Sequence, residues 1–217
     1  MTARLPPQPV PAAAPKADAL LHDVDGVVVD WDGTVVDNAQ IRLSALQQAL
    51  APYGVDVDPQ WYALTCGLPV REVIACCAGP RTLPVEEIVT ASRRLLLNGP
   101  LPRLIDSTMN LLRRAEALSL PRAVASAAAG VLIHPVIDRL DLGGLLPVVV
   151  TAESVARGKP APDAYLEAAR LIGRAPSRCL AVDDAPDGIT SGLEAGMRVL
   201  AVRDGLLVPV VPGPVPR

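Results

Sequence analysis

Residues 26–37 read GVVVDWDGTVVD, so a short run of valines ends at two carboxylates, Asp30 and Asp32. Short, uniformly apolar runs are typical of strands that are buried on both faces of a parallel sheet. Ligands of open α/β sheets bind outside the carboxyl ends of the strands, so these two acids are expected to face a site. For this stretch taken alone, an ordinary Asp-Gly hairpin turn is the alternative.

Four later runs have the same apolar character, and polar or glycine-rich residues follow each of them. They lie at residues 123–125, 147–150, 179–182 and 199–202. Helix-length segments separate these runs, as in the crossover connections of parallel sheets. The pattern predicts an α/β fold with a Rossmann-like parallel sheet as its core.

A long segment that reads mostly as helix separates the first run from the second. Ile41, Ala45, Ala49 and Tyr53 fall on one face of a helix, and further apolar residues repeat at helical spacing after them. We therefore expect a small α-helical cap domain to be inserted at residues 38–100.

The remaining boundaries follow from this insertion. The α/β core domain is expected at residues 19–37 and 101–205. Residues 1–18 are predicted to form a disordered tail rich in proline and alanine, and residues 206–217 a proline-rich C-terminal tail.

The composition limits the classes of function. Half of the 217 residues are hydrophobic and the net charge is -3. No run of lysine or arginine exceeds two residues, which argues against a nucleic-acid partner. No apolar stretch reaches the length of a membrane span, so no membrane partner is expected.

The cysteines indicate a reducing compartment. None of the four forms a C-x-x-C pair, and Cys76 and Cys77 are adjacent, which argues against a zinc site or a disulfide framework. We interpret them as reduced thiols of a cytoplasmic protein. The sequence does not distinguish a monomer from a homodimer.

Polar residues close the later strand-like runs or follow them. Ser126 ends the second run, and Asp183 and Asp184 end the fourth. Residues 158–163 read GKPAPD, in which the prolines stiffen the backbone after Lys159. Each motif alone has an ordinary alternative, namely a strand-end serine, a solvated loop lysine, or an acidic turn before a helix.

In this order the motifs resemble those of the haloacid dehalogenase superfamily, whose first motif is an apolar strand followed by D-x-D-G-[TV]-x-x-D. The resemblance covers residues 26–202. The expected cap is similar in size and position to that of the subgroup containing phosphoglycolate phosphatase and β-phosphoglucomutase. This resemblance implies a Mg²⁺-dependent phosphatase that forms an aspartyl-phosphate intermediate. Its substrate would be a small phosphorylated metabolite, such as a sugar phosphate or phosphoglycolate.

The resemblance also implies roles for the acidic residues. Asp30 is the nucleophile, and Asp32 first protonates the leaving alkoxide and then takes a proton from water. Mg²⁺ is held by the carboxylates of Asp30 and Asp184 and by the backbone carbonyl of Asp32. Asp183 supports these ligands without binding the ion itself. Dehalogenating members lack the second aspartate, so Asp32 favours phosphoryl transfer.

An alkyl phosphate repels an anionic nucleophile unless positive charge offsets the charge of its oxygens. By the resemblance, Lys159 supplies part of that charge, and Ser126 binds the phosphate through its hydroxyl and backbone donors. Ala127 and Gly33 are expected to complete the phosphate-binding residues.

An earlier stretch, HDVDGV at residues 22–27, is a second candidate for the first motif. We prefer Asp30, because the residues after it enter the first cap helix at the spacing of the family. A start at Asp23 would leave the following WDGT unexplained. Asp23 and Asp25 are then polar residues in the approach to the first strand.

Two arginines of the expected cap bear on the function. Arg42 stands where mutases of the subgroup carry a histidine that assists acid–base switching, which favours a hydrolase over a mutase. We interpret Arg71 as an exposed helix arginine paired with a neighbour, with substrate contact as the alternative. Two further functions stay open: a phosphosugar mutase, and a non-catalytic protein of the same fold that binds a phosphorylated ligand.

Overall fold

The computed structural model describes residues 17–65 and 68–211. Most of the predicted N-terminal tail, residues 66–67 and residues 212–217 lie outside these ranges. The helix α1 (Ala17–Leu20) begins inside the predicted tail. Of the helices in the described ranges, none combines the length and the apolar character that crossing a membrane requires.

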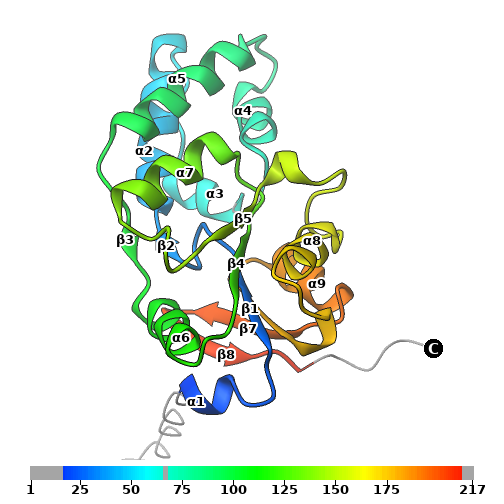
Figure 1. Cartoon of the computed structure of the whole chain (residues 1–217). Helices are drawn as coiled ribbons and strands as arrows, with labels where there is room; N and C mark the ends of the chain where they lie inside the picture. Colours follow the sequence, from blue (N-terminus) through cyan, green and yellow to red (C-terminus); the bar gives the residue numbers. More distant parts are fainter. Residues whose placement is uncertain (1–16, 66–67, 212–217) are drawn as a thin grey trace, which may run out of the picture.

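A six-stranded sheet forms the core of the molecule (Figure 1). Its order is β5-β4-β1-β6-β7-β8, in which β8 alone runs antiparallel to its neighbour. The bounds are β1 (Gly26–Val29), β4 (Arg122–Ala125), β5 (Val148–Val150), β6 (Cys179–Asp183), β7 (Arg198–Arg203) and β8 (Leu206–Pro209). Each of the five predicted runs is a strand, so the α/β prediction is confirmed.

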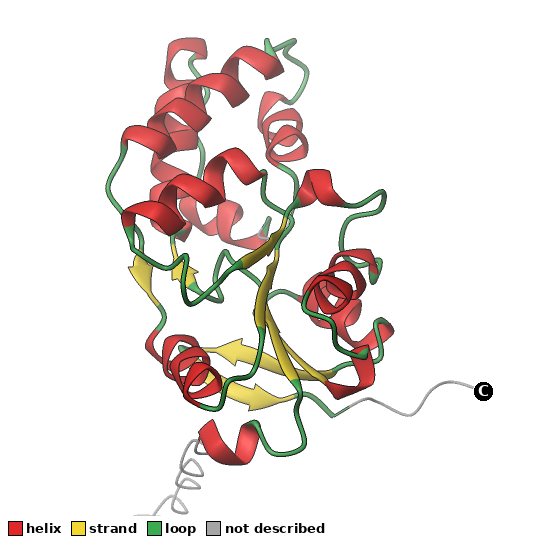
Figure 2. Cartoon of the chain, viewed as in Figure 1, coloured by secondary structure: helices red, strands yellow, loops and turns green. Residues whose placement is uncertain are grey.

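Side chains of β1 alternate between two hydrophobic clusters. Val27 and Val29 belong to one cluster with residues of α1, α6 (Asp106–Ala117) and α7 (Gly130–Arg139). Val28 belongs to the other, with residues of α8 (Asp163–Leu171) and α9 (Pro186–Glu194). Helices therefore cover both faces of the sheet, and α6 and α8 lie on opposite sides of it (Figure 2). Burial on both faces explains why the strand is a run of valines without polar alternation.

The strand register brings the polar ends of neighbouring strands together. Val29 of β1 lies opposite Val124 of β4 and Val182 of β6. The residues that follow Val29 and Val182 are Asp30 and Asp183, so both acids lie at the same edge of the sheet. This is the edge at which the sequence predicts a site.

Within the described residues, five helical segments lie between two short strands, β2 (Val36–Asp37) and β3 (Arg103–Leu104). They are α2 (Ala39–Leu50), η1 (Ala51–Tyr53), α3 (Pro59–Leu64), α4 (Val70–Ala78) and α5 (Val85–Asn98). The strands β2 and β3 pair as an antiparallel ribbon. The helices pack around a hydrophobic cluster of their own, whose fully buried members include Leu50, Ile74 and Ile88. We call residues 38–100 the helical insertion; its helices lie together beyond one end of the sheet (Figure 1).

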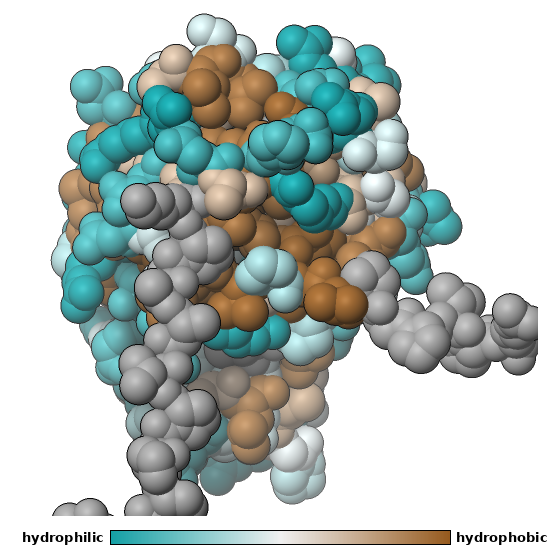
Figure 3. Space-filling model, turned by 90° about the horizontal axis from the view of Figure 1, so that it is seen from below, coloured by the Kyte–Doolittle hydropathy of each residue, from teal (hydrophilic) through white to brown (hydrophobic). Residues whose placement is uncertain are grey.

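The C-terminal tail is shorter than predicted, because residues 206–209 form β8 and pair with β7. Leu207 turns inward and joins the core, whereas Leu206 and Val208 remain 50% and 44% exposed. Pro209 is tolerated there, since an edge strand does not need every N–H for pairing. Apolar surface lies among hydrophilic residues on the lower face of the molecule (Figure 3).

Candidate active site

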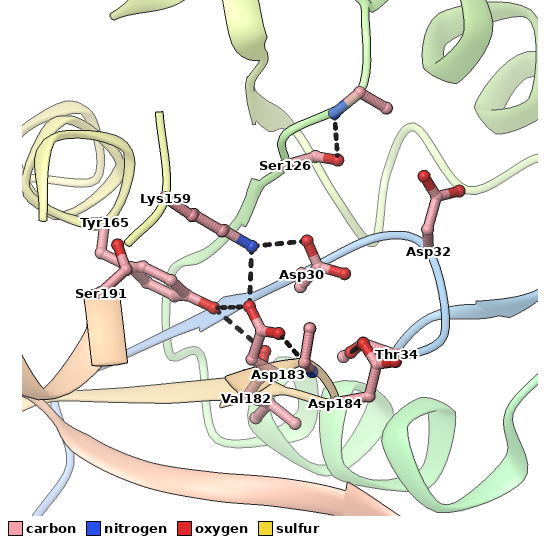
Figure 4. A network of polar contacts seen from close by, with 12 residues as sticks. Asp30, Asp32, Thr34, Ser126, Lys159, Tyr165, Val182, Asp183, Asp184 and Ser191 are labelled. Carbon is pink, nitrogen blue, oxygen red and sulfur yellow. Dashed lines mark hydrogen bonds and ion pairs between the residues drawn. The ribbon is translucent and has the colours of Figure 1, made fainter. Parts of the chain in front are cut away.

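Asp30 directly follows β1 and is buried at the centre of the site. Its N–H donates to the Val182 carbonyl at 2.8 Å, so the sheet pairing extends through this residue, which is 6% exposed. Its Oδ1 accepts a hydrogen bond from Lys159 Nζ at 2.6 Å (Figure 4). The sheet and the lysine together fix this carboxylate.

Lys159 bridges carboxylates from two strands. Its Nζ donates to Asp30 Oδ1 and, at 2.7 Å, to Asp183 Oδ2, and its side chain is 8% exposed. An ammonium group has three N–H donors, so one is left for a further acceptor. Burial alone would lower the pKa of Lys159, but the charges of Asp30 and Asp183 outweigh burial and raise the pKa. The lysine therefore stays charged.

Asp183 ends β6, and hydrogen-bond donors occupy both of its carboxylate oxygens. Its Oδ2 accepts from Lys159 Nζ and from the Tyr165 hydroxyl, both at 2.7 Å, and its Oδ1 accepts from the Ala185 N–H at 3.0 Å. Gly188 lies against this carboxylate, and a Cβ at Gly188 would stand 1.9 Å from Oδ2. Only glycine lets α9 come so close. These contacts are consistent with the supporting position predicted for Asp183.

Asp184 directly follows β6 and contacts residues of the first motif. Its Oδ1 accepts from Thr34 Oγ1 at 3.1 Å. Gly33 has a φ of +79°, and a Cβ there would stand 2.2 Å from Asp184 Oδ2. The Gly33 N–H donates to the Val36 carbonyl at 2.8 Å, so this donor is already used within the turn. Gly33 therefore makes room for Asp184, and its predicted phosphate contact stays a prediction.

The acids form a group that can hold a metal ion. Oxygen atoms of Asp30, Asp183 and Asp184 all lie within 4.8 Å of one another. Burial, opposed by Lys159 and reinforced by the other two carboxylates, holds the pKa of Asp30 well above its ordinary value. Burial and then the charge of Asp183 also raise the pKa of Asp184.

A hard divalent cation such as Mg²⁺ fits this group, because it prefers carboxylate oxygens and offsets their mutual repulsion. The donors on Asp183 compete with a metal for its lone pairs. Asp30 and Asp184 therefore have more lone pairs left for a metal, and their role as its ligands stays a prediction.

Asp32 lies apart from the carboxylate group (Figure 4). Its two oxygens accept hydrogen bonds from Asn38 Nδ2 and Arg42 Nη1, each at 2.5 Å, and its side chain is 23% exposed. Asn38 directly precedes α2 and Arg42 lies in its first turns. The second aspartate of the motif is therefore tied to the helical insertion.

Ser126 follows β4 and is 2% exposed. Its N–H donates to the Val150 carbonyl at 2.9 Å, and its Oγ accepts from the Ala128 N–H at 3.1 Å. The hydroxyl proton stays available to a ligand. Ala127 is exposed, and its N–H has no acceptor within the described residues. In this segment the donors left for an anion are thus the Ser126 hydroxyl and the Ala127 N–H, not the Ser126 N–H.

The rejected first motif lies before β1, at the opposite end of the strand from Asp30. The Asp25 carboxylate accepts two hydrogen bonds from Arg178 at 3.0 Å, and Asp23 pairs with His22 at 2.8 Å. Asp25 therefore fastens the start of the strand to a neighbouring turn.

Arg71 lies on the exposed surface of the insertion. It makes two hydrogen bonds to the Glu86 carboxylate, at 2.7 and 2.8 Å. The pairing predicted for Arg71 is thus found, with a partner on α5.

Sequence reasoning missed four residues of the site: Tyr165, Thr34, Asn38 and Gly188. For Tyr165 the sequence holds one signal, since a tyrosine among the alanines of an apolar helix face needs a partner for its buried hydroxyl. For the other three, only the distances to Asp184, Asp32 and Asp183 reveal the contacts.

The fold and the site define a class: an α/β enzyme core with a buried lysine and a cation-binding group of acids at the carboxyl edge of its sheet. A model of the haloacid dehalogenase-like hydrolase family matches residues 27–202. The chain belongs to this family, as the order of its motifs predicts.

Named relatives in the family are phosphatases. Hexitol phosphatase A of Escherichia coli is 35% identical over 193 residues, which cover 82% of this chain and 82% of the relative. A fructose-1-phosphate phosphatase of Escherichia coli is 30% identical over 187 residues, which cover 82% of this chain and 96% of the relative.

Solved structures share the fold. A hydrolase of the family from Deinococcus radiodurans, with bound phosphate and sodium, has a TM-score of 0.65 at 26% identity, over 82% of this chain and 80% of that one. A predicted phosphoglycolate phosphatase from Haemophilus somnus has a TM-score of 0.73 at 18% identity, over 85% and 87%. A β-phosphoglucomutase from Clostridium difficile has a TM-score of 0.67 at 20% identity, over 83% and 85%. The fold of this chain is thus the fold of the predicted subgroup.

Proposed function

We propose that this protein is a Mg²⁺-dependent phosphatase that transfers the phosphoryl group of a small organic phosphate to Asp30 and then to water. The named relatives support the class, a phosphoric monoester hydrolase. The observation that carries the mechanism is the position of Lys159. It bridges Asp30 and Asp183, keeps one N–H to spare, and lies beside acids that can hold a cation.

In the first step an oxygen of Asp30 attacks phosphorus, the bond from phosphorus to the alkoxide breaks, and Asp32, which enters this step protonated, gives the alkoxide its proton. In the second step Asp32 takes a proton from water, whose oxygen attacks the same phosphorus, and the bond from phosphorus to the Asp30 oxygen breaks. Inorganic phosphate leaves, Asp30 is again a free carboxylate, and Asp32 is again protonated.

The non-bridging oxygens need donors and positive charge during both steps. The spare N–H of Lys159 and the hydroxyl of Ser126 supply two donors, and the Ala127 N–H a third. Bound Mg²⁺ would supply further positive charge against these oxygens. Asp30 and Asp184 would hold it with their carboxylates and Asp32 with its backbone carbonyl.

The environment of Asp32 supports a hydrolase over a mutase. Arg42 holds the Asp32 carboxylate in an ion pair, whereas the mutases of the subgroup have a histidine at this position. A guanidinium keeps its proton at working pH, so it cannot exchange one with Asp32.

We further propose a sugar phosphate or a phosphoglycolate-like metabolite as the substrate. The names of the relatives, a hexitol phosphatase and a fructose-1-phosphate phosphatase, support this class. In this proposal residues 38–100 act as a cap over a core of residues 19–37 and 101–205. The protein works in the cytoplasm as a monomer or a homodimer.

The test is hydrolysis of p-nitrophenyl phosphate with and without Mg²⁺, comparing Asp30→Asn with Asp23→Asn. The second variant makes the same chemical change at the position of the rejected motif that corresponds to Asp30. We expect Mg²⁺-dependent turnover in the wild type, a loss of more than about a thousandfold in Asp30→Asn, and little change in Asp23→Asn.

Other outcomes point elsewhere. Loss in Asp23→Asn instead would mean that the earlier motif is the active one. A silent wild type that still binds phosphate would indicate a non-catalytic binder. Conversion of one sugar-phosphate isomer to another without phosphate release would indicate a mutase.

A further inference from the structure

Tyr165 is a fully buried residue that contacts both ends of the bridge between Lys159 and Asp183. Its hydroxyl lies 2.7 Å from Asp183 Oδ2 and 3.4 Å from the Val182 carbonyl. A phenol has one proton, and a carboxylate is the stronger acceptor, so the hydroxyl donates to Asp183. The ring centroid lies 5.1 Å from Lys159 Nζ, within the range of a cation–π interaction.

The backbone around Tyr165 is well fixed. The residue lies in the first turn of α8, shortly after the loop that carries Lys159. Ser191 of α9 donates to the Ala161 carbonyl in that loop at 2.6 Å. The loop is therefore fastened on both sides of Pro162, and a small change at Tyr165 is transmitted to the lysine instead of being absorbed by the loop.

The Tyr165 hydroxyl is suited to act as a hydrogen-bond donor to Asp183. Burial, followed by the charges of Asp183 and Asp30, raises the pKa of Tyr165 well above its ordinary value. The hydroxyl thus keeps its proton and its direction. With Lys159 and Tyr165 both donating to Oδ2, the Asp183 carboxylate has one preferred orientation.

We propose that Tyr165 is a positioning residue for Lys159. Its hydroxyl orients Asp183, its ring supports the ammonium group, and the spare N–H of Lys159 is thereby directed at the phosphoryl oxygens. The role toward the phosphoryl oxygens rests on the proposed phosphatase function. The effect of Tyr165 on the position of Lys159 can be measured without turnover.

The chain has two lysines, Lys16 and Lys159, so ¹⁵N-lysine labelling gives a spectrum of two side-chain ammonium signals. A Lys16→Arg variant assigns them. Tyr165→Phe keeps the ring and removes the hydroxyl, so we expect the Lys159 signal to shift while the Lys16 signal stays. Tyr165→Leu also removes the ring current, so a larger shift is expected. A Lys159 signal that is unchanged in both variants would overturn the proposal.

Kinetics with p-nitrophenyl phosphate and inhibition by inorganic phosphate give the functional test. We expect Tyr165→Phe to lower kcat/KM and to weaken inhibition by phosphate, each by about ten- to a hundredfold, with the Mg²⁺ concentration for half-activation unchanged. In a Lys159→Ala background the same substitution should cause no further loss, because its effect runs through the lysine. Tyr53→Phe, the same change at a half-buried tyrosine of the helical insertion, should leave activity unchanged.

Full activity of Tyr165→Phe, or an equal loss in the Lys159→Ala background, would contradict the proposal. Asp183→Asn provides a second route if Tyr165→Phe does not fold, and it should also shift the Lys159 signal. If the wild type hydrolyses no phosphate ester at all, the proposed function fails, while the ammonium spectrum still decides the role of Tyr165.

Discussion

Two glycines set how closely the acids of the site can approach the backbone. A Cβ at Gly33 would enter the carboxylate of Asp184, and one at Gly188 would enter that of Asp183. In both places the neighbouring atoms are functional oxygens that cannot simply move aside. The short distances from Asp184 and Asp183 to the neighbouring backbone therefore require glycine at positions 33 and 188.

Gly188→Ala is expected to damage both stability and activity, although alanine is the better helix former. The methyl group must push Asp183 away or displace α9, at a loss of about 1–3 kcal/mol in the free energy of unfolding. Urea unfolding and turnover of p-nitrophenyl phosphate measure the two effects. Gly143→Ala is the matched control, since a Cβ there meets nothing within 4 Å. Equal stability of the two variants would show that α9 has room to spare.

Arg42→Gln is expected to separate substrates by their leaving groups. Asp32 must be placed to protonate an alkoxide, whereas p-nitrophenolate leaves without a proton, so loss of the ion pair should affect alkyl phosphates more. We expect kcat for a sugar phosphate to fall about tenfold or more relative to kcat for p-nitrophenyl phosphate. Parallel decreases for both substrates would contradict a role through Asp32.

Much of the site could be predicted from single residues, because Asp30, Lys159 and Asp184 stand in recognisable motifs at strand ends. The environment of Asp32 could not, since it depends on where α2 begins relative to the loop after β1. Tyr165 reaches Asp183 across the fold, and no local pattern states that contact. The phosphate contact of Gly33 stays a prediction, and its close approach to Asp184 is a contact that the motif alone does not reveal.

Among the elements, the five strands buried on both faces were the most predictable, because such burial leaves uninterrupted apolar runs. The two-residue strands β2 and β3 were not predicted, and neither was β8, which has one buried residue, Leu207, between exposed neighbours and ends in proline. Its pairing with β7 arises from the tight turn before it, and its sequence resembles that of a proline-rich tail.

The helical insertion has its own core, and α2 and α5 are its main pair. Ile88 of α5 is completely buried there, so Ile88→Ala should lower the free energy of unfolding by about 2–5 kcal/mol, against about 0.5–1.5 kcal/mol for Ile88→Val. Urea unfolding compares the two variants. We expect the Mg²⁺ concentration for half-activation to stay unchanged in both. A similar small loss in the two variants would mean that the site around Ile88 collapses without leaving a cavity.

For the whole molecule, the raised pKa values of Asp30 and Asp184 link stability to pH and metal. Between the ordinary carboxyl pKa and the raised value, the metal-free folded state holds protons that the unfolded state has released. The contribution of these groups to stability therefore falls as pH rises through that window. Mg²⁺ binds the ionised carboxylates. It therefore stabilises the folded state most at pH values where these groups have lost their protons.

The rise in Tm on adding Mg²⁺ is thus expected to be larger at pH 8 than at pH 5. Each sample is compared with a chelator-treated sample at the same pH. The effect of the surface carboxylates on Tm is the same in both and is removed by the subtraction. Asp184→Asn removes one ligand and should reduce the Mg²⁺-dependent rise at pH 8. A rise that is the same at both pH values would place the metal away from these acids.

The ribbon of β2 and β3 has a consequence for engineering. Val36 lies opposite Leu104 and Asp37 opposite Arg103, so the chain leaves the sheet domain and returns to it at adjacent points. Because the two ends of the insertion lie side by side, we expect a segment of different length to be accommodated between them with little change in the strands below. The contacts of Asn38 and Arg42 with Asp32 are the part of this junction that a graft would have to keep.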